Sequence, residues 1–388
     1  MTDPRLEKLA RLLVDYSLGL RKGQWLTISG PAPASPLIRE VYRVAMRRGA
    51  FVETLVAIDG LSEILFQEAS PEQLQHILPT RLLRTRRADA QLSIRGDVNT
   101  RSLTSADPKR QAMWAAAQKR WRRIFFDRAA KGQLHWVLTQ WPTHANAQDA
   151  EMSLSEYEDF IFGAGHLDDD DPVKTWRTIS RSQQALTNRL NKARSIRIVA
   201  ADTDITLSVK GRKWINSCGH ENFPDGEIFT GPVETDVEGH IRYSFPSIHP
   251  SLDREVDNVF LEFRQGKVVV ARADKGEDFL REMVDMDAGS SRLGELAFGT
   301  NYHITRYTRN GLFDEKIGGT VHLALGAGYP ETGNRNSSGL HWDMVCDLRT
   351  RGKIFADGEL ISENGRFLDK RYPQPPGEGR SRKSARRR

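Results

Sequence analysis

The hydrophobic periodicity of this chain changes near residue 190, and that change limits the folds it can adopt. Before it, short apolar runs that suit strands alternate with segments of helical period. After it, a period of two dominates, in residues 195–200, 204–209, 259–263 and 267–271. The pattern predicts an N-terminal α/β domain with an open sheet and a larger C-terminal α+β domain. We place these domains at residues 1–190 and 191–370, followed by a disordered tail, 371–388.

The first half predicts a βαβ unit. Its strand runs from Trp25 to Ser29, its helix from about 36 to 48 and its second strand from 51 to 58. Further strands are expected at 90–94 and 135–139, and helices from 108 through the alanine run at 115–117, at 153–162 and at 172–191. The loop 30–34 lacks the glycine spacing of a dinucleotide or phosphate loop, so a nucleotide site there has little support.

The N-terminus predicts a short amphipathic helix with Asp3 as its cap and Pro4 at its first position, and not a signal peptide. No stretch approaches the roughly 18 uninterrupted apolar residues of a membrane span. We therefore expect a cytoplasmic protein that makes no membrane contact.

Charge and cysteine content narrow the choice of partners. The net charge is +6, but residues 373–388 hold six basic residues and one acidic residue, so the remainder is nearly neutral. The basic balance thus describes the tail and not the folded surface. Cys218 and Cys346 are the only cysteines, which excludes a disulfide framework or a thiolate zinc ribbon. Any metal must use oxygen and imidazole ligands.

Histidine, glycine and acidic residues gather between residues 216 and 345. In His341-Trp342-Asp343, an extended strand would place the imidazole and the carboxylate on one face and the indole on the other. Such a pair suits zinc, cobalt or manganese, although the triplet alone often arises by chance. His322 lies in a predicted buried strand, on the face shared with Thr320 and Ala324. By itself it could equally be a core histidine bonded to a backbone carbonyl.

Four further residues are candidates. Tyr329 follows in a tight glycine-rich loop and could offer its phenolic oxygen to a metal or substrate, or simply pack. Glu227 follows a Pro-Asp-Gly turn and could be an exposed hairpin residue. Glu295, followed by apolar residues, is the better candidate for burial, and a buried carboxylate requires a partner charge or a metal. Glu315 is a third acidic residue in the same region.

These segments resemble the aminopeptidase T family of metallo-aminopeptidases, which includes aminopeptidase S and PepS-like enzymes. The resemblance covers roughly residues 1–368 and is strongest after residue 200. It is carried by Pro224-Asp225-Gly226-Glu227 with Thr230-Gly231-Pro232, Gly294-Glu295 with Gly299-Thr300-Asn301, the run from Glu315 to Gly326, His341-Trp342-Asp343, and the weaker segment from Asp357 to Phe367.

The resemblance implies a homodimeric enzyme that removes N-terminal residues from peptides with a free N-terminus. It also implies two divalent ions, which could be zinc, cobalt, magnesium or manganese, with the carboxylate of Glu295 bridging them. The resemblance implies six ligand residues: Glu227, Glu295, His322, Tyr329, His341 and Asp343. A carboxylate outside this set is still needed to move protons, and Glu315 is our candidate for the catalytic base.

Two alternatives compete with this interpretation. Arg81, Arg84, Arg86 and Arg87, the cluster at 119–123 and the tail could bind nucleic acid, although basic residues around one tryptophan more often form a solvated helix face. The chain could also be an inactive relative that serves as an interaction module. The presence of all six expected ligands argues against the second alternative.

Overall fold

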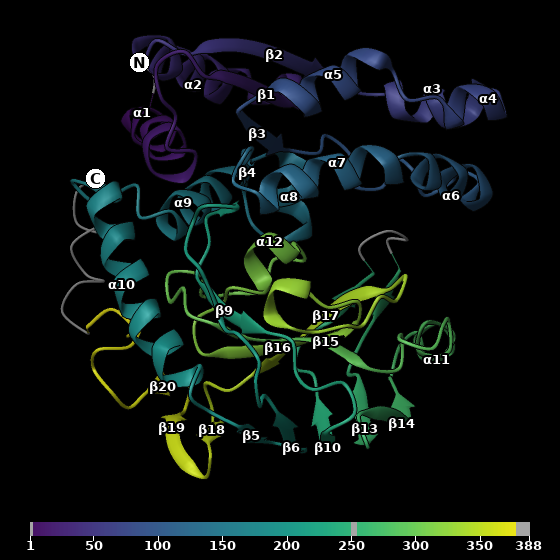
Figure 1. Ribbon diagram of the computed structural model, residues 1–388, viewed down its shortest axis with the longest axis vertical. Coiled ribbons are helices and arrows are strands. Elements are labelled where there is room, and N and C mark those ends of the chain that lie inside the picture. Colours follow the sequence, from purple (N-terminus) through teal and green to yellow (C-terminus); the bar gives the residue numbers. More distant parts are fainter. Residues whose placement is uncertain (1–2, 250–253, 378–388) are drawn as a thin grey trace. The chain divides into compact units, whose positions relative to one another are not determined.

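The computed structural model describes residues 3–249 and 254–377 and divides the chain into two compact units (Figure 1). Unit 1 comprises Met1–Val173 and Gly219–Pro224, and unit 2 comprises Lys174–Cys218 and Asp225–Arg388. This division precedes the predicted boundary by one helix. The reason is packing, because Leu186 and Leu190 of that helix belong to the core of unit 2. Of the predicted tail, residues 378–388 lie outside the described residues, whereas Tyr372 packs against the core of unit 2.

Unit 1 contains a five-stranded parallel sheet in the order β2-β1-β3-β4-β8, as the βαβ pattern predicted. Its elements are α1 (Pro4–Arg11), η1 (Leu12–Ser17), β1 (Trp25–Pro31), η2 (Ala32–Ala34), α2 (Ser35–Arg47), β2 (Phe51–Ala57), α3 (Leu61–Glu68), α4 (Pro71–Gln75), α5 (Pro79–Arg87), β3 (Ala90–Arg95), α6 (Pro108–Ala117), α7 (Lys119–Ala130), β4 (His135–Gln140), α8 (His144–Asp149), α9 (Leu154–Ala164) and β8 (Asn222–Phe223). As predicted, Asp3 caps α1 by accepting a hydrogen bond from the backbone N–H of Arg5.

The two faces of this sheet differ. On one face, the position of Gly30 lies against Ile38 of α2 and Ile94 of β3, and Leu26 and Ile28 are fully buried. Residues alternate along a strand, so Thr27 and its neighbours on the same side point to the opposite face. Pairs of helices accompany the sheet, with α4 packed on α6 and α5 on α7.

Unit 2 contains two large sheets and one small one. Their orders are β14-β13-β10-β6-β5-β18-β19-β20, β17-β16-β15-β9-β7 and β11-β12. The elements are α10 (Pro172–Leu190), β5 (Ser195–Ala200), β6 (Thr203–Ser208), β7 (Ile215–Ser217), β9 (Glu227–Thr230), β10 (Val237–Arg242), β11 (Ser247–Ile248), β12 (Glu255–Val256), β13 (Phe260–Arg264), β14 (Lys267–Arg272), α11 (Glu277–Val284), β15 (Leu293–Gly299), α12 (Gly311–Asp314), β16 (Thr320–Gly326), η3 (Pro330–Thr332), β17 (His341–Asp347), β18 (Lys353–Ala356), β19 (Glu359–Glu363) and β20 (Arg366–Phe367).

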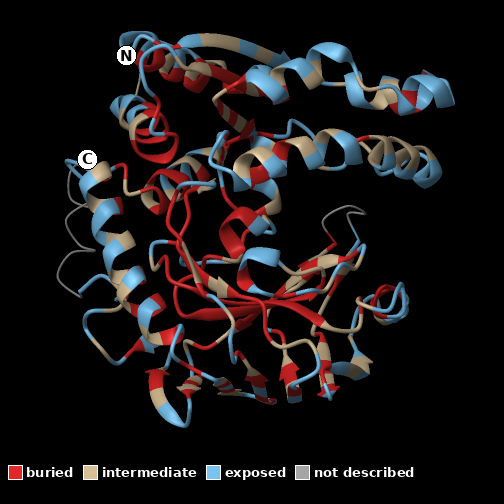
Figure 2. Ribbon diagram, in the orientation of Figure 1, coloured by how far each residue is buried: buried red, intermediate tan, exposed pale blue. Residues whose placement is uncertain are grey.

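The two large sheets of unit 2 share one hydrophobic core. Ile196 and Ile198 of the eight-stranded sheet and Leu323 and Trp342 of the five-stranded sheet belong to the same buried cluster. Figure 2 shows the central strands of unit 2 largely in the colour of buried residues. The predicted fold class, an α/β part with a parallel sheet and a mixed part with antiparallel sheets, is confirmed.

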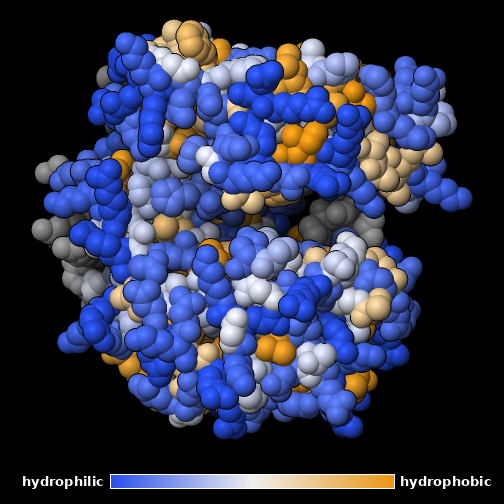
Figure 3. All heavy atoms as spheres, viewed as in Figure 1, coloured by the Kyte–Doolittle hydropathy of each residue, from blue (hydrophilic) through white to orange (hydrophobic). Residues whose placement is uncertain are grey.

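The face seen in Figure 3 is mostly hydrophilic, with small groups of hydrophobic side chains. Among the described residues, no helix is long and apolar enough to cross a membrane.

Candidate metal centre

The five-stranded sheet of unit 2 carries acidic residues and histidines on one face, at positions where neighbouring strands meet. Glu227 begins β9, Glu295 lies on β15, His322 on β16, and His341 and Asp343 on β17. The strand register pairs Ala324 with both Glu295 and Asp343, which brings residues far apart in sequence to one place. The opposite face is apolar, because Val321, Leu323, Leu325 and Trp342 point into the core.

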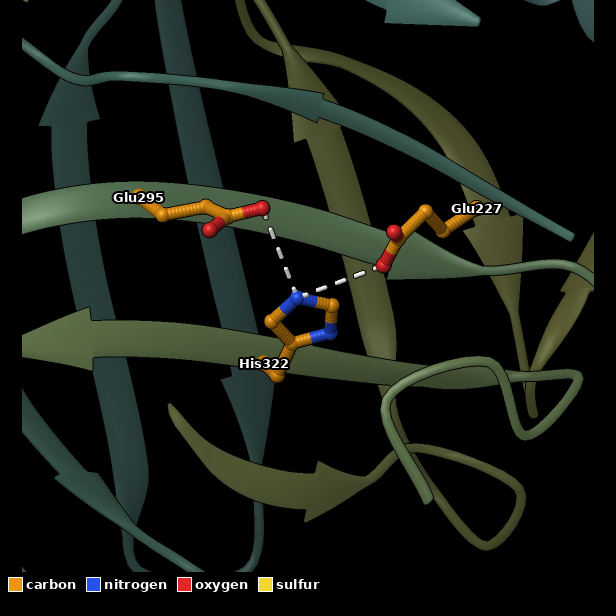
Figure 4. A group of neighbouring side chains, drawn as sticks. All are labelled: Glu227, Glu295 and His322. Carbon is orange, nitrogen blue, oxygen red and sulfur yellow. Dashed lines mark ion pairs between the residues drawn. The ribbon is translucent and has the colours of Figure 1, made fainter. Parts of the chain in front are cut away.

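These side chains form two overlapping groups. In the first, His322 Nε2 lies 3.5 Å from Glu227 Oε2 and 3.6 Å from Glu295 Oε1 (Figure 4). In the second, His341 Nε2 lies 3.5 Å from Glu295 Oε2 and 3.3 Å from Asp343 Oδ2. Each of the two carboxylate oxygens of Glu295 therefore faces a different imidazole, and Glu295 belongs to both groups.

The spacing of the donor atoms fits metal coordination. Two ligand atoms, each about 2.1 Å from a tetrahedral ion, are separated by about 3.4 Å, which is close to the observed contacts. Three buried atoms here also lack a hydrogen-bond partner among the described residues: Glu227 Oε2, His322 Nδ1 and Asp343 Oδ1. Since buried polar atoms are normally satisfied, the two oxygens are suited to a cation. The residues present thus fit divalent ions.

The electrostatics of the group are those of a cation site. Burial raises the pKa of Glu227 to about 8 and also raises the pKa of Glu295. Burial opposes charge on both imidazoles, but the neighbouring carboxylates outweigh it, raising the pKa of His322 to about 9 and that of His341 to about 10. Burial also opposes charge on Asp343, yet His341 holds its pKa below the usual range. The carboxylates therefore favour the protonated form of both imidazoles, as they would favour a bound cation.

Local backbone features place Glu227 and Glu295. Gly226 has φ +126°, and a Cβ there would lie 2.7 Å from the Cβ of Asn301, so only glycine fits before Glu227. Next to Glu295, the pairing of β15 with β16 is irregular between Leu293 and Glu295. A Cβ on Gly294 would lie 2.1 Å from the backbone oxygen of Ala327. Both glutamates follow glycines that let the backbone approach a neighbouring strand or loop.

His341 is oriented by the loop that precedes its strand. Its Nδ1 lies 2.8 Å from the backbone oxygen of Ala327, so an N–H donated there leaves Nε2 free to bind a metal. Tyr329 lies on the same side, with its ring 5.4 Å from the imidazole of His341. The charge of Glu295, followed by burial, raises the pKa of Tyr329 well above its usual value. The phenol therefore lies within the field of these carboxylates.

Glu315 is connected to the group through Lys316. Lys316 is 1% exposed, and its Nζ lies 2.7 Å from Glu315 Oε2 and 3.2 Å from Glu227 Oε1. Burial disfavours its charge, but Glu227 and Glu315 outweigh burial and raise its pKa well above the usual value. Glu315 is more accessible, with a side chain 25% exposed, as a group that exchanges protons with a substrate requires.

The structure thus brings five of the six predicted ligand residues within two groups and places Tyr329 beside them. Glu227 is buried like Glu295, so the interpretation of Glu227 as an exposed hairpin residue is wrong. His341 and Asp343 share a face opposite Trp342, as expected. Sequence reasoning overlooked Lys316, because a lysine is normally read as exposed and its acidic neighbour Glu227 is far away in the sequence.

Comparisons with known proteins identify the family of this chain. A model of the thermophilic metalloprotease family M29 matches residues 2–367. Aminopeptidase 2 of Geobacillus stearothermophilus is 30% identical over 362 residues, covering 84% of each chain. Aminopeptidase T of Thermus thermophilus is 27% identical, covering 86% of this chain and 87% of the relative.

Two solved structures share the fold. Wild-type AmpT from Thermus thermophilus superposes with a TM-score of 0.83 at 24% identity, covering 94% of this chain and 99% of that one. A 2,5-dihydroxypyridine dioxygenase from Pseudomonas putida KT2440 superposes with a TM-score of 0.56 at 11% identity, covering 94% and 98%. The fold therefore occurs with unrelated chemistry and does not by itself determine the reaction.

The family match extends over nearly the whole described chain, and the relatives are named as aminopeptidases. The family and enzyme class predicted from the sequence, a metallo-aminopeptidase, are confirmed, and neither the nucleic-acid nor the inactive alternative is favoured. The chain belongs to the M29 family of thermophilic metalloproteases.

Proposed function

We propose that this chain is an aminopeptidase that uses two divalent metal ions held on the polar face of the five-stranded sheet of unit 2. The observation that carries the proposal is the position of Glu295, whose two carboxylate oxygens face His322 and His341 separately. A carboxylate shared by two ligand groups would hold two ions close together, as a two-metal hydrolase requires.

In this proposal Glu227, Glu295 and His322 hold one ion, and Glu295, His341 and Asp343 hold the other. Tyr329 is the sixth proposed ligand, because its ring lies against His341. Imidazole and carboxylate donors suit zinc, cobalt or manganese, and carboxylates also suit magnesium. The preference among these metals, the homodimer and the cytoplasmic location stay predictions.

Two divalent ions held by these residues would supply Lewis acidity for the scissile carbonyl and would lower the pKa of the attacking water. The chain's own residues then move the protons. Glu315 accepts a proton from the attacking water and donates it to the leaving amine. Lys316 positions Glu315 and offsets the charge of Glu227, since its Nζ contacts both. A free substrate amino group is proposed to bind beside the ions or an acidic residue, which limits cleavage to the first peptide bond.

Hydrolysis of leucine p-nitroanilide by the full chain tests this proposal, with its N-acetylated counterpart as the matched control. We expect turnover of the free amine only, loss of that turnover after chelation, and its return when cobalt or zinc is added. Equal cleavage of the acetylated compound would contradict an exopeptidase. Undiminished turnover after complete metal removal would contradict a metal-dependent reaction.

A further inference from the structure

Unit 1 contains a cavity of about 940 Å³ whose lining includes no residue of the metal site, and its volume is within the range of small-molecule sites. One side is the face of the parallel sheet opposite α2, and the other side comes from α3 to α7 and the segments between them. Every residue of its lining belongs to unit 1. Its chemistry is therefore independent of the proposed peptidase reaction.

The sheet face that lines the cavity is polar, which is unusual for a parallel sheet. Strands covered on both faces are normally apolar on both. Here Thr27 and Ser29 of β1 and Gln91 and Ser93 of β3 face the cavity. They bond weakly to each other: Ser29 Oγ lies 3.4 Å from Ser93 Oγ, and Gln91 Nε2 donates to Ser93 Oγ at 3.2 Å. Packing alone does not account for a sheet face of hydroxyl and amide groups beneath a layer of helices.

The guanidinium of Arg81 lies above this sheet face, and it has no acidic partner among the described residues. The guanidinium carbon of Arg81 is 4.0 Å from the centroid of the Trp121 ring, and Arg81 Nη1 donates to Gln118 Oε1 at 3.0 Å. Trp121 is itself fixed, because its Nε1 donates to Thr85 Oγ1 at 2.7 Å. A guanidinium carries five N–H donors, and among the described residues only Gln118 accepts one from Arg81. Arg81 is held in place with most of its donors unused.

The neighbouring charges leave the site positive. Burial lowers the pKa of Arg81, and the charges of Arg84 and Arg122 lower it further. Arg84 has a carboxylate within reach, since its Nη1 lies 3.7 Å from Glu53 Oε1. Glu72 also lines the cavity. With Arg84 partly compensated, about one positive charge is uncompensated, so a monoanion matches better than a phosphate dianion.

The remaining lining is apolar and aromatic. It includes Leu55, Leu65, Ile77 and Trp114. A ligand with an apolar part would displace water from these side chains, while its charged group would bind the guanidinium of Arg81. Planar guanidinium groups bind carboxylates with two parallel hydrogen bonds.

We propose that this cavity is a binding site for a small organic monocarboxylate, with its carboxylate on Arg81 and its apolar body against Trp114 and the leucines of the lining. The site is separate from the metal-binding sheet face, and the proposal does not depend on the peptidase reaction. Arg81, Arg84 and Trp121, which the sequence offered as part of a nucleic-acid surface, instead line this cavity.

Calorimetric titration of the full chain tests the proposal with three probes of similar shape: 3-phenylpropionate, its neutral amide and phenyl phosphate. The metals are removed by chelation first, so that a carboxylate cannot bind to them. We expect saturable binding of 3-phenylpropionate, binding at least about tenfold weaker for the amide, and weaker binding of phenyl phosphate. Tighter binding of phenyl phosphate would overturn the choice of a monocarboxylate.

Three variants locate the site. Arg81→Leu should weaken 3-phenylpropionate binding at least about tenfold, whereas Arg86→Leu on the same helix, outside the lining, should leave it unchanged. Ser93→Leu places a larger apolar side chain on the sheet side of the cavity and should also weaken binding, while leaving the contacts of Arg81 with Trp121 and Gln118 in place. Either absence of saturable binding to the unmodified chain, or equal binding by the Ser93→Leu variant, would overturn the proposal.

Discussion

Each unit contains a sheet with one apolar and one polar face, but the two polar faces carry opposite chemistry. In unit 2, three carboxylates and two imidazoles converge on the five-stranded sheet. In unit 1, hydroxyl and amide groups of the parallel sheet lie beneath Arg81 and Arg84. The apolar faces are alike, since both form buried cores. The apolar face of each sheet therefore supports the fold, whereas the sign of the charge on its polar face indicates the charge of the ligand.

The largest effect is expected from Glu295→Ala, because this residue belongs to both ligand groups. Aminopeptidase turnover should fall to the background, and metal analysis should show loss of both ions. Glu282→Gln is the matched control, since Glu282 is an exposed acid of the same unit. Full retention of both ions by the Glu295→Ala variant would remove the bridging role from the account.

Replacement of the proposed base, Glu315→Gln, should lower kcat by about 10²–10⁴-fold while the metal content stays unchanged. The reason is that Glu315 contacts Lys316 and belongs to neither ligand group. Steady-state kinetics and metal analysis of one sample distinguish the roles. If metal is lost together with activity, Glu315 acts as a ligand and the proposed base is wrong.

Lys316→Met should destabilise the metal-free chain by about 1–3 kcal/mol, because buried Glu227 loses the ammonium group that lies 3.2 Å from its Oε1. Urea unfolding of unit 2, followed by the fluorescence of its buried tryptophans, measures this change. The control is Lys353→Met, since Lys353 and Glu363 form an exposed pair whose loss should cost less than about 1 kcal/mol. Equal effects of the two changes would show that the burial of Lys316 is unimportant.

The smallest effect is expected on the polar face of unit 1. Ser29→Val should change the free energy of unfolding by less than about 1 kcal/mol, because only weak hydroxyl contacts are lost. Its neighbour on the apolar face, Ile28, is fully buried, and Ile28→Ala should cost about 2–5 kcal/mol. Denaturant midpoints of both variants test this alternation. A larger cost for Ser29→Val would mean that the polar face serves stability and not binding.

Much of the fold was predictable because its signals are local. The strand at β1 and the helix at α2 follow from apolar periodicity and from glycine and proline at their ends, and they begin within one residue of the predicted positions. By contrast, α5 was not predicted, since its arginines obscure any apolar stripe. The assignment of α10 to unit 2 depends on tertiary packing of Leu186 and Leu190, which no local pattern shows.

The candidate site was predictable only in part, for the same reason. The alternation within His341-Trp342-Asp343 gives a shared face directly. The approach of Glu227 to His322 depends on the register of β9, β15 and β16, which spacing along the chain does not reveal. The resemblance to a family supplied that connection. The buried Lys316 had no such guide, because its burial becomes evident only when its two acidic neighbours are placed in space.

The most direct test of the central claim is the number of metal ions bound per chain, measured by plasma emission on the purified protein after equilibration with zinc or cobalt and removal of free metal. The account predicts two ions per chain for the unmodified protein. A stoichiometry of one or none in a sample with full aminopeptidase turnover would contradict it.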